Sequence, residues 1–268
     1  MVYNFCTGAL RLIGPTNCAE TRRSHGSQGK GLWGGHLTGT QLKQVETKRL
    51  YQHIADQIRS LIQSGDFAPG ARLPPERDLA QQLGVSRPSL REALIALEIG
   101  GSVEIRQGSG VYVCRAPERS LNATAALGES PSELMQARAV LEGSVIVLAA
   151  ALITPERLAR LRETLDAMRA QVQSGRSPLD HDRAFHVCIA EMSGNLVLVR
   201  MVTELFDERH SPISARLSGH AETGQTWAAA LEEHEAIYRA LEERDPLAAQ
   251  SAMRSHLKAS EIRWTETG

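Results

Sequence analysis

The tripeptide Gly84-Val85-Ser86 constrains this chain more than any other feature, because it separates two short amphipathic segments by one tight turn. Before it, residues 76–83 begin with acidic side chains and continue with apolar ones at helical spacing. After it, Ser86 is a favourable N-cap for a second helix. The apolar stripe of that helix is Leu90, Ala93, Leu94 and Leu97. The sequence therefore predicts two helices that meet at a sharp turn.

The segments on either side extend this pair of helices into a small domain. Upstream, residues 50–61 carry aliphatic side chains at helical spacing, and the pattern ends at SGDFAPG. Downstream, Gly100 and Gly101 end the second helix of the pair. The following run, SVEIRQGSGVYV, alternates around a glycine-rich centre, which is typical of a β-hairpin. Three helices followed by a hairpin predict a winged helix-turn-helix over residues 47–114.

The second half of the chain predicts helices only. Ser130-Pro131-Ser132-Glu133 is a typical helix start, and apolar residues recur at helical spacing from there to residue 263. The fold class is therefore mostly α, with an N-terminal winged helix-turn-helix (three helices plus a β-hairpin wing) followed by an all-α helical bundle. We expect a disordered tail over 1–46, a linker over 115–129, and an effector-binding and dimerisation domain over 130–263.

Bulk composition narrows the class of protein. The formal net charge is −1, so any binding to nucleic acid must come from a local patch of arginines. The four cysteines show no CxxC spacing, which fits a reducing compartment. We expect no run that is apolar over the roughly 18–20 residues needed to span a membrane. The sequence therefore predicts a cytoplasmic protein without a membrane partner.

Polar residues near the sharp turn indicate a surface that reads double-stranded DNA. The second helix of a helix-turn-helix enters the major groove, where arginine contacts guanine O6 and N7. Arg87, Ser89 and Arg91 lie away from the centre of the apolar stripe, and Arg77 begins the preceding helix. The wing tip RQG allows close approach to a neighbouring groove. The alternative is that these arginines are ordinary solvated side chains.

The run LPPERDLAQQLGVSRPSLREALIALEIGGSVEIRQGSGVYV resembles the winged-helix domain of the GntR family of bacterial transcription regulators. The resemblance covers about residues 50–113. It implies DNA contacts at Arg77, Ser86, Arg87, Ser89, Arg91, Gln107 and Gly108. It also implies a homodimer on a short palindromic operator, as two-fold symmetry would require.

Three of the nine histidines fall on inward stripes of the helical half. Asp182 and His186 form an i, i+4 pair, while His234 and His256 lie on the apolar faces of two later helices. Three imidazoles and a carboxylate in a bundle can together satisfy one divalent cation. The alternative is that they are separate core histidines bonded to backbone.

The segments DRAFH, EEHEAIYRAL and AMRSHL resemble the FCD effector domain of the FadR subgroup of GntR regulators. This resemblance implies that Asp182, His186, His234 and His256 hold a metal, with zinc favoured and nickel or iron as alternatives. It also implies that Arg138 binds the carboxylate of an effector. Asn195 and Trp227 are weaker candidates for lining the effector pocket. A solvated Arg138–Glu142 pair, a helix C-cap at Asn195 and core filling by Trp227 are the alternatives.

These features predict a sequence-specific DNA-binding transcription regulator, a repressor rather than an enzyme. A small anionic metabolite would control its affinity for the operator. The segment PSELMQARAVLE and the end AMRSHLKAS are most similar to regulators of hexuronate catabolism, which implies a hexuronate or a derivative as effector. Two other functions stay open, a metal-dependent hydrolase or isomerase with an accessory winged helix, and a protein-interaction module.

Overall fold

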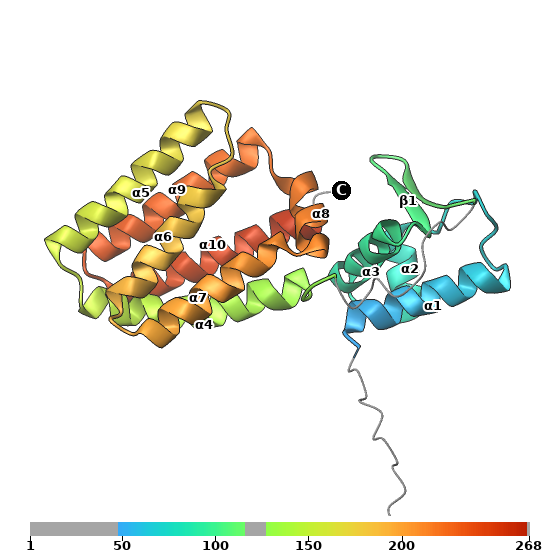
Figure 1. The fold of residues 1–268 in the computed structure, drawn as a ribbon, viewed down its shortest axis with the longest axis horizontal. Helices are drawn as coiled ribbons and strands as arrows, with labels where there is room; N and C mark the ends of the chain where they lie inside the picture. Colours follow the sequence, from blue (N-terminus) through green and yellow to red (C-terminus); the bar gives the residue numbers. More distant parts are fainter. Residues whose placement is uncertain (1–47, 116–126, 267–268) are drawn as a thin grey trace, which may run out of the picture. The chain divides into compact units, whose positions relative to one another are not determined.

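A computed structural model describes residues 48–115 and 127–266 of the 268-residue chain. The N-terminal part contains three helices and one hairpin (Figure 1). These elements are α1 (Leu50–Ser64), α2 (Glu76–Leu83), α3 (Arg87–Ile99), β1 (Val103–Arg106) and β2 (Gly110–Val113). This order is the winged helix-turn-helix that the sequence predicts.

The turn between α2 and α3 forms as its residues predict. Gly84 ends α2 with a left-handed backbone, at φ 68°, where a side chain would be strained. Ser86 begins α3, and its Oγ accepts a hydrogen bond from the Ser89 amide at 3.2 Å. A glycine exit and a serine cap therefore set the sharp turn through the backbone and side chains of the turn itself.

The wing is a two-stranded antiparallel sheet in which Val103 pairs with Val113 and Arg106 pairs with Gly110. Gly110 has a φ of 119°, and a Cβ there would lie 2.6 Å from Nε of Arg72. The hairpin therefore requires glycine at this position.

One apolar core holds the winged helix together. It is formed by residues from α1, α2, α3 and both strands, with Leu127 and two residues of α8 added to it. Its fully buried large side chains are Tyr51, Ile54, Ile58, Leu79, Leu90, Leu94 and Leu97. All of these except Tyr51 are inward positions that the helical spacing in the sequence predicts, whereas Leu50, which the same spacing includes, is 54% exposed.

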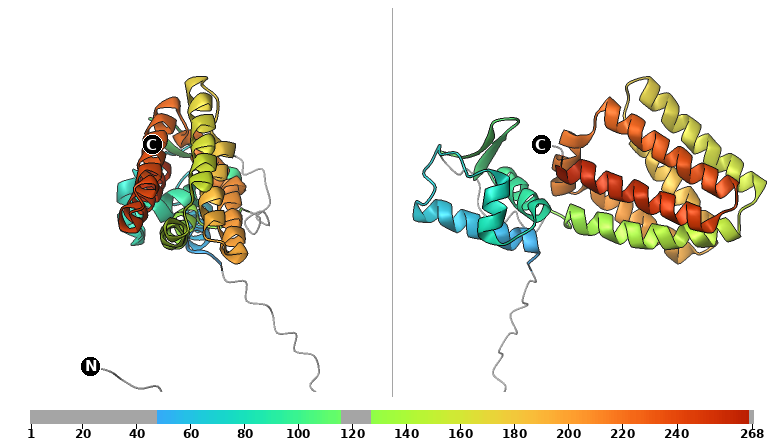
Figure 2. Two further views of the ribbon diagram at one scale, coloured as in Figure 1. Left: turned by 90° about the vertical axis from the view of Figure 1, so that its left-hand side faces the viewer. Right: turned by 180° about the vertical axis from the view of Figure 1, so that it is seen from behind.

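The described C-terminal part is entirely helical, as expected. Its helices are α4 (Pro131–Ala151), α5 (Pro155–Gln173), α6 (Leu179–Met192), α7 (Leu196–Asp207), the 3₁₀ turn η2 (Glu208–His210), α8 (Pro212–Ala221), α9 (Gly224–Glu242) and α10 (Pro246–Glu266). The long helices α4 and α10 pack along each other, and α5 packs on α6 and α9 (Figures 1 and 2). The core of this bundle includes Ile146, Leu161, Leu165, Phe185, Ile237 and Met253. The predicted fold class is therefore confirmed.

Helix α4 corrects one expectation. Its mean hydropathy reaches 1.5 over an 18-residue window, so by length and composition alone it could cross a membrane. Half of that window is buried inside the protein, and Arg138 and Glu142 form a buried ion pair on it. These contacts are those of a core helix in a helical bundle.

Two predicted segments lie outside the described residues. The predicted tail over 1–46 does so entirely, and the predicted linker does so over residues 116–126. The described end of that linker contains Leu127, which packs into the winged-helix core.

We predict that Gly84→Ala lowers the free energy of unfolding by about 1–2 kcal/mol, because alanine must adopt the left-handed conformation of residue 84. Gly219→Ala is the matched control. Gly219 lies inside α8, and no atom lies within 4 Å of the position that a Cβ would occupy, so alanine there stabilises the protein by up to about 1 kcal/mol. Urea unfolding followed by circular dichroism measures both, and equal effects of the two substitutions would contradict the prediction.

Candidate functional site

The start of α3 and the preceding turn carry an exposed polar surface. Arg77, Ser86 and Arg87 are exposed, while Ser89 is half-buried. The hydroxyls of Ser86 and Ser89 lie 2.8 Å apart, so the cap orients both of them. Arg87 lies at the start of α3 and Arg77 in the first turn of α2, and two exposed arginines on this pair of helices suit contacts with a phosphate backbone and a groove.

Arg91 differs from the other predicted DNA contacts. Its side chain is only 10% exposed, and its Nε and Nη2 donate to Oε2 of Glu76 at 3.3 and 2.9 Å. Arg91 therefore joins α3 to the start of α2, which corrects the expectation of a solvent-facing side chain. Helical spacing missed this pairing because Glu76 belongs to another helix.

The wing tip is exposed. Gln107 and Gly108 lie at the turn of the hairpin, and Gly108 has a φ of 70° with open space where a Cβ would be. Beside them, Arg106 pairs with Glu104 at 2.8 Å and lies over the ring of Tyr112. Because Gly108 has no side chain, its backbone can come close to a DNA groove.

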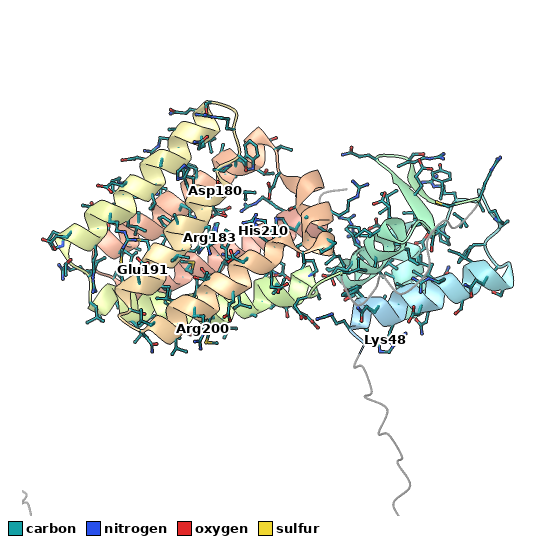
Figure 3. The ribbon with its side chains drawn as sticks, in the orientation of Figure 1. Lys48, Asp180, Arg183, Glu191, Arg200 and His210 are labelled. Atoms are coloured by element: carbon teal, nitrogen blue, oxygen red, sulfur yellow. The ribbon has the colours of Figure 1, made fainter. Side chains whose placement is uncertain are left out.

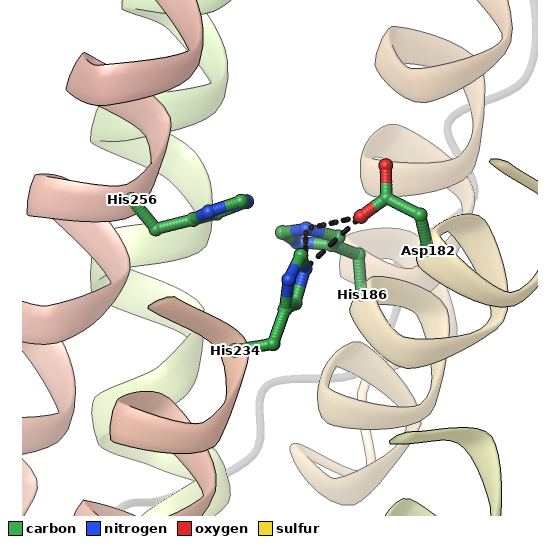
Figure 4. Close-up of side chains that lie close together, drawn as sticks. All are labelled: Asp182, His186, His234 and His256. Carbon is green, nitrogen blue, oxygen red and sulfur yellow. Dashed lines mark hydrogen bonds and ion pairs between the residues drawn. The ribbon is translucent and has the colours of Figure 1, made fainter. Parts of the chain in front are cut away.

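Four side chains that the sequence predicts as metal ligands meet inside the helical domain. Asp182 and His186 come from α6, His234 from α9 and His256 from α10 (Figure 4). One candidate ligand atom from each lies within 4.8 Å of the others. The three histidines are buried, so their rings are held by the core rather than by solvent.

The Nδ1 atom of each histidine forms a hydrogen bond to a group outside the cluster. His186 donates to Oε2 of Glu142, His256 donates to Oε2 of Glu233 at 2.8 Å, and His234 donates to the carbonyl of Ala230 at 2.6 Å. Such bonds fix the ring orientation and leave Nε2 as the ligand atom. The Nε2 atoms of His186 and His234 then face each other at 3.4 Å.

Hydrogen-bond acceptors meet at the centre of the cluster, and no donor from the part of the chain that the structure describes lies between them. Asp182 Oδ1 lies 3.0 Å from Nε2 of His234 and 3.5 Å from Nε2 of His186. When both rings are neutral with Nδ1 protonated, as metal binding requires, neither Nε2 carries a hydrogen, and Oδ1 has no hydrogen-bond partner among the described residues. Imidazole nitrogens and a carboxylate oxygen suit a divalent cation such as zinc, so the residues fit the metal that the FCD resemblance implies.

Burial and neighbouring charges set the protonation around the cluster. Burial, together with the adjacent His234, lowers the pKa of His256 to about 3, so this imidazole is neutral and available as a ligand. Burial opposes the charge of Glu142, but Arg138 and His186 outweigh it and lower its pKa to about 2. Glu142 therefore stays an anion that accepts from His186.

A pocket of about 60 Å³ opens beside the cluster. Its polar lining includes Arg138, Arg209, Glu222, Thr226, Ser260 and Arg263, and its aromatic lining is Trp227 and Trp264. Three arginines beside the candidate metal ligands provide the positive charge that an anionic ligand needs.

Two of the three predicted effector residues line this pocket. Arg138 is buried, and its Nε donates to Glu142 at 2.7 Å, so the alternative of a solvated pair is wrong. Its Nη2 and the Nε1 of Trp227 are buried donors with no hydrogen-bond partner in the described part of the chain. Unmet donors that line a pocket are suited to a ligand that accepts hydrogen bonds.

Asn195 is not part of the pocket. It is the N-cap of α7, where its Oδ1 accepts from the amides of Val197 and Leu198 at 3.0 and 3.3 Å. The predicted effector role is therefore corrected to a structural one. A cap was one of the alternatives, but at the start of a helix rather than the end.

Sequence reasoning missed Arg209 and Arg263. Arg209 lies in the short turn η2, which has no periodic pattern, and its Nη1 donates to Oδ2 of Asp182 at 2.9 Å. Arg263 follows the predicted ligand His256 by seven residues and so shares its face of α10. That spacing could have identified Arg263, whereas nothing local could have identified Arg209.

Two family models match the two halves of the chain. Residues 50–113 match the family described as "Bacterial regulatory proteins, gntR family", and residues 133–259 match the FCD domain. Among solved structures, "Streptococcus agalactiae GntR" is 28% identical, with a TM-score of 0.43, over 79% of this chain and 98% of that one.

Three curated relatives cover most of the chain. The "Uxu operon transcriptional regulator" of Escherichia coli is 35% identical over 80% of this chain and 86% of its own length. The "Exu regulon transcriptional regulator" of Escherichia coli is 33% identical, over 81% and 85%. The "Uxu operon regulator" of Haemophilus influenzae is 31% identical, over 81% and 83%. The chain therefore belongs to the gntR family of bacterial regulatory proteins, as a DNA-binding transcription regulator with an FCD domain and not as an enzyme.

Proposed function

We propose that this regulator is a repressor whose affinity for its operator is controlled by a small sugar acid bound in the metal-containing pocket. The observation that carries the proposal is the pairing of an acceptor-only cluster with unmet donors in one pocket. Asp182 and the three histidines suit a cation, while Arg138 and Trp227 suit the oxygen atoms of a ligand. A cation and an arginine together would bind the carboxylate of such a ligand from two sides.

The relatives support the class of effector. Their names refer to the Uxu operon and the Exu regulon, and regulators of hexuronate catabolism resemble this chain. A hexuronate carries a carboxylate for the arginines and a ring that Trp227 or Trp264 can contact. Zinc is the metal we favour, with nickel or iron as alternatives.

On the DNA side we propose contacts from Arg77, Ser86, Arg87, Ser89, Gln107 and Gly108. Contact by Arg91 stays a prediction, because its guanidinium is engaged by Glu76. The binding unit would be a homodimer on a palindromic operator. Exposed apolar side chains on α4 and α7, among them Val140, Leu196 and Met201, support a second copy as their partner.

The domain limits and the compartment are also proposals. We assign residues 47–114 to DNA binding and residues 130–263 to effector binding and dimerisation. The cytoplasm suits a regulator that must reach DNA, and the half-buried α4 is accounted for by the bundle.

We predict that Arg87→Ala weakens binding to a selected operator by roughly 10- to 100-fold, because one bidentate base contact is worth about 1–3 kcal/mol. The operator is first selected from random DNA with the purified protein, and it should contain two inverted half-sites. Arg176→Ala, in the exposed segment between α5 and α6, is the matched control. Fluorescence anisotropy measures affinity, and similar losses for both variants would argue against direct readout by Arg87.

We predict that the wild-type chain binds one equivalent of zinc and that His186→Ala loses this binding. The loss should exceed the roughly 10- to 100-fold that removal of an outer partner produces. Glu142→Gln, which alters such an outer partner, should fall within that range. His53→Ala, an exposed histidine on α1, is the control. Isothermal titration calorimetry measures all four proteins, and unchanged affinity in His186→Ala would refute the metal site.

We predict that galacturonate or glucuronate binds the zinc-loaded protein and weakens its hold on the operator, whereas glucose does neither. Trp227→Phe keeps an aromatic ring but removes the buried Nε1 donor, so affinity for the uronate should fall by about five- to tenfold. Tyr238→Phe, on the same helix but outside the pocket lining, is the matched control. Calorimetry and anisotropy are the measurements, and no response to any sugar acid would remove this class of effector.

A further inference from the structure

Arg209 connects the predicted metal cluster to the segment around α8. Its Nη1 donates to Oδ2 of Asp182 at 2.9 Å, and its Nη2 donates to Oε1 of Glu222 at 3.0 Å. The guanidinium is 11% exposed and lies 5.0 Å from the ring centroids of Phe206 and Trp264. One buried cation therefore holds two carboxylates in fixed positions.

The two carboxylates lie at different places in the chain. Asp182 is on α6, whereas Glu222 directly follows the last residue of α8. Arg209 precedes α8 by a few residues, so the Arg209–Glu222 pair closes the segment that contains α8. Burial raises the pKa of Glu222, which means that its charge depends on this arginine.

Two side chains of α8 belong to the winged-helix core. Ile213 and Leu217 are buried among core residues of α1, α3 and the wing. The Ile213 amide also donates to the carbonyl of Leu127 at 3.1 Å. Arg216 donates twice to Glu98 of α3, at 2.9 and 3.0 Å. α8 is therefore attached to the helix whose start carries Arg87.

We propose that Arg209 is a positioning residue that transmits the state of the metal and effector pocket through α8 to α3. This inference rests on the proposed function. Arg209 lines the pocket, so an anionic ligand there competes with Asp182 and Glu222 for its donors. A cation held by Asp182 and the histidines would weaken the attraction between Asp182 and Arg209, so that the guanidinium would pair more firmly with Glu222 at the end of α8. Either event changes how firmly the base of α8 is held, and α3 moves with α8.

Hydrogen exchange of the full chain, with zinc as the only added ligand, tests the first step. Zinc should slow amide exchange in α8 of the wild-type protein by about tenfold, within the usual range of site-to-site coupling. In Arg209→Gln, zinc should still bind in calorimetry, but exchange in α8 should change by less than about twofold.

The matched control is Arg183→Gln. The Arg183 guanidinium, labelled in Figure 3, donates two hydrogen bonds to Asp207 between α6 and α7, at 2.6 and 2.9 Å, and so joins two helices without bonding to the carboxylate of Asp182 or Glu222. It should behave as the wild type. Equal slowing of α8 in Arg209→Gln and Arg183→Gln, or no slowing in a wild type that binds zinc, overturns the inference and leaves the metal site standing. Failure of the wild type to bind zinc overturns the proposed function and the inference together.

A second variant tests the step from α8 to α3 without touching the pocket. Arg216→Glu should abolish the effect of zinc and galacturonate on operator affinity, while zinc binding stays within about twofold of wild type. Adding Glu98→Arg restores the ion pair with reversed charges and should restore the response. A normal response in Arg216→Glu, or no recovery in the double variant, overturns this step even if Arg209→Gln fails to fold.

Discussion

The helical domain depends on one constraint: buried acceptor atoms face one another, and no donor in the described ranges lies between them. Nε2 of His186, Nε2 of His234 and Oδ1 of Asp182 converge in a buried volume, and His256 completes the group. A buried polar atom left unsatisfied costs about 1–3 kcal/mol, so a chain that gathers several is destabilised unless something positive joins them. A cation that binds only the folded chain would then stabilise it.

The surroundings of the cluster serve the same constraint. The carboxylates of Glu142 and Glu233 orient two of the rings, and each carboxylate is held in turn by an arginine, Arg138 or Arg263. Buried charges of opposite sign offset the cost of desolvation only when they are paired closely. Because Arg138, Arg263 and Arg209 also line the pocket, the groups that position the cluster are those that an anionic ligand would meet.

The DNA-binding half depends on local rules, and the sequence predicted it well. Gly84 and Ser86 act through their own backbone and cap, so the turn needs no distant partner. Arg91 shows where such reasoning stops, since helical spacing could not reveal Glu76 of the neighbouring helix as its partner. Asn195 shows the same limit, because a cap is recognised only when the start of its helix is known.

By itself, the sequence determined the order of elements, the inward faces of the helices and the candidate ligands on those faces, since helical periodicity is local. Spacing placed Asp182 and His186 on one helix face and His234 and His256 on the inward stripes of two others, and the resemblance to a known domain favoured one shared metal site over separate core histidines. Only the tertiary structure decided that these faces meet, because that depends on how α6, α9 and α10 pack. It alone also brought Arg209, in a turn without periodicity, between Asp182 and α8.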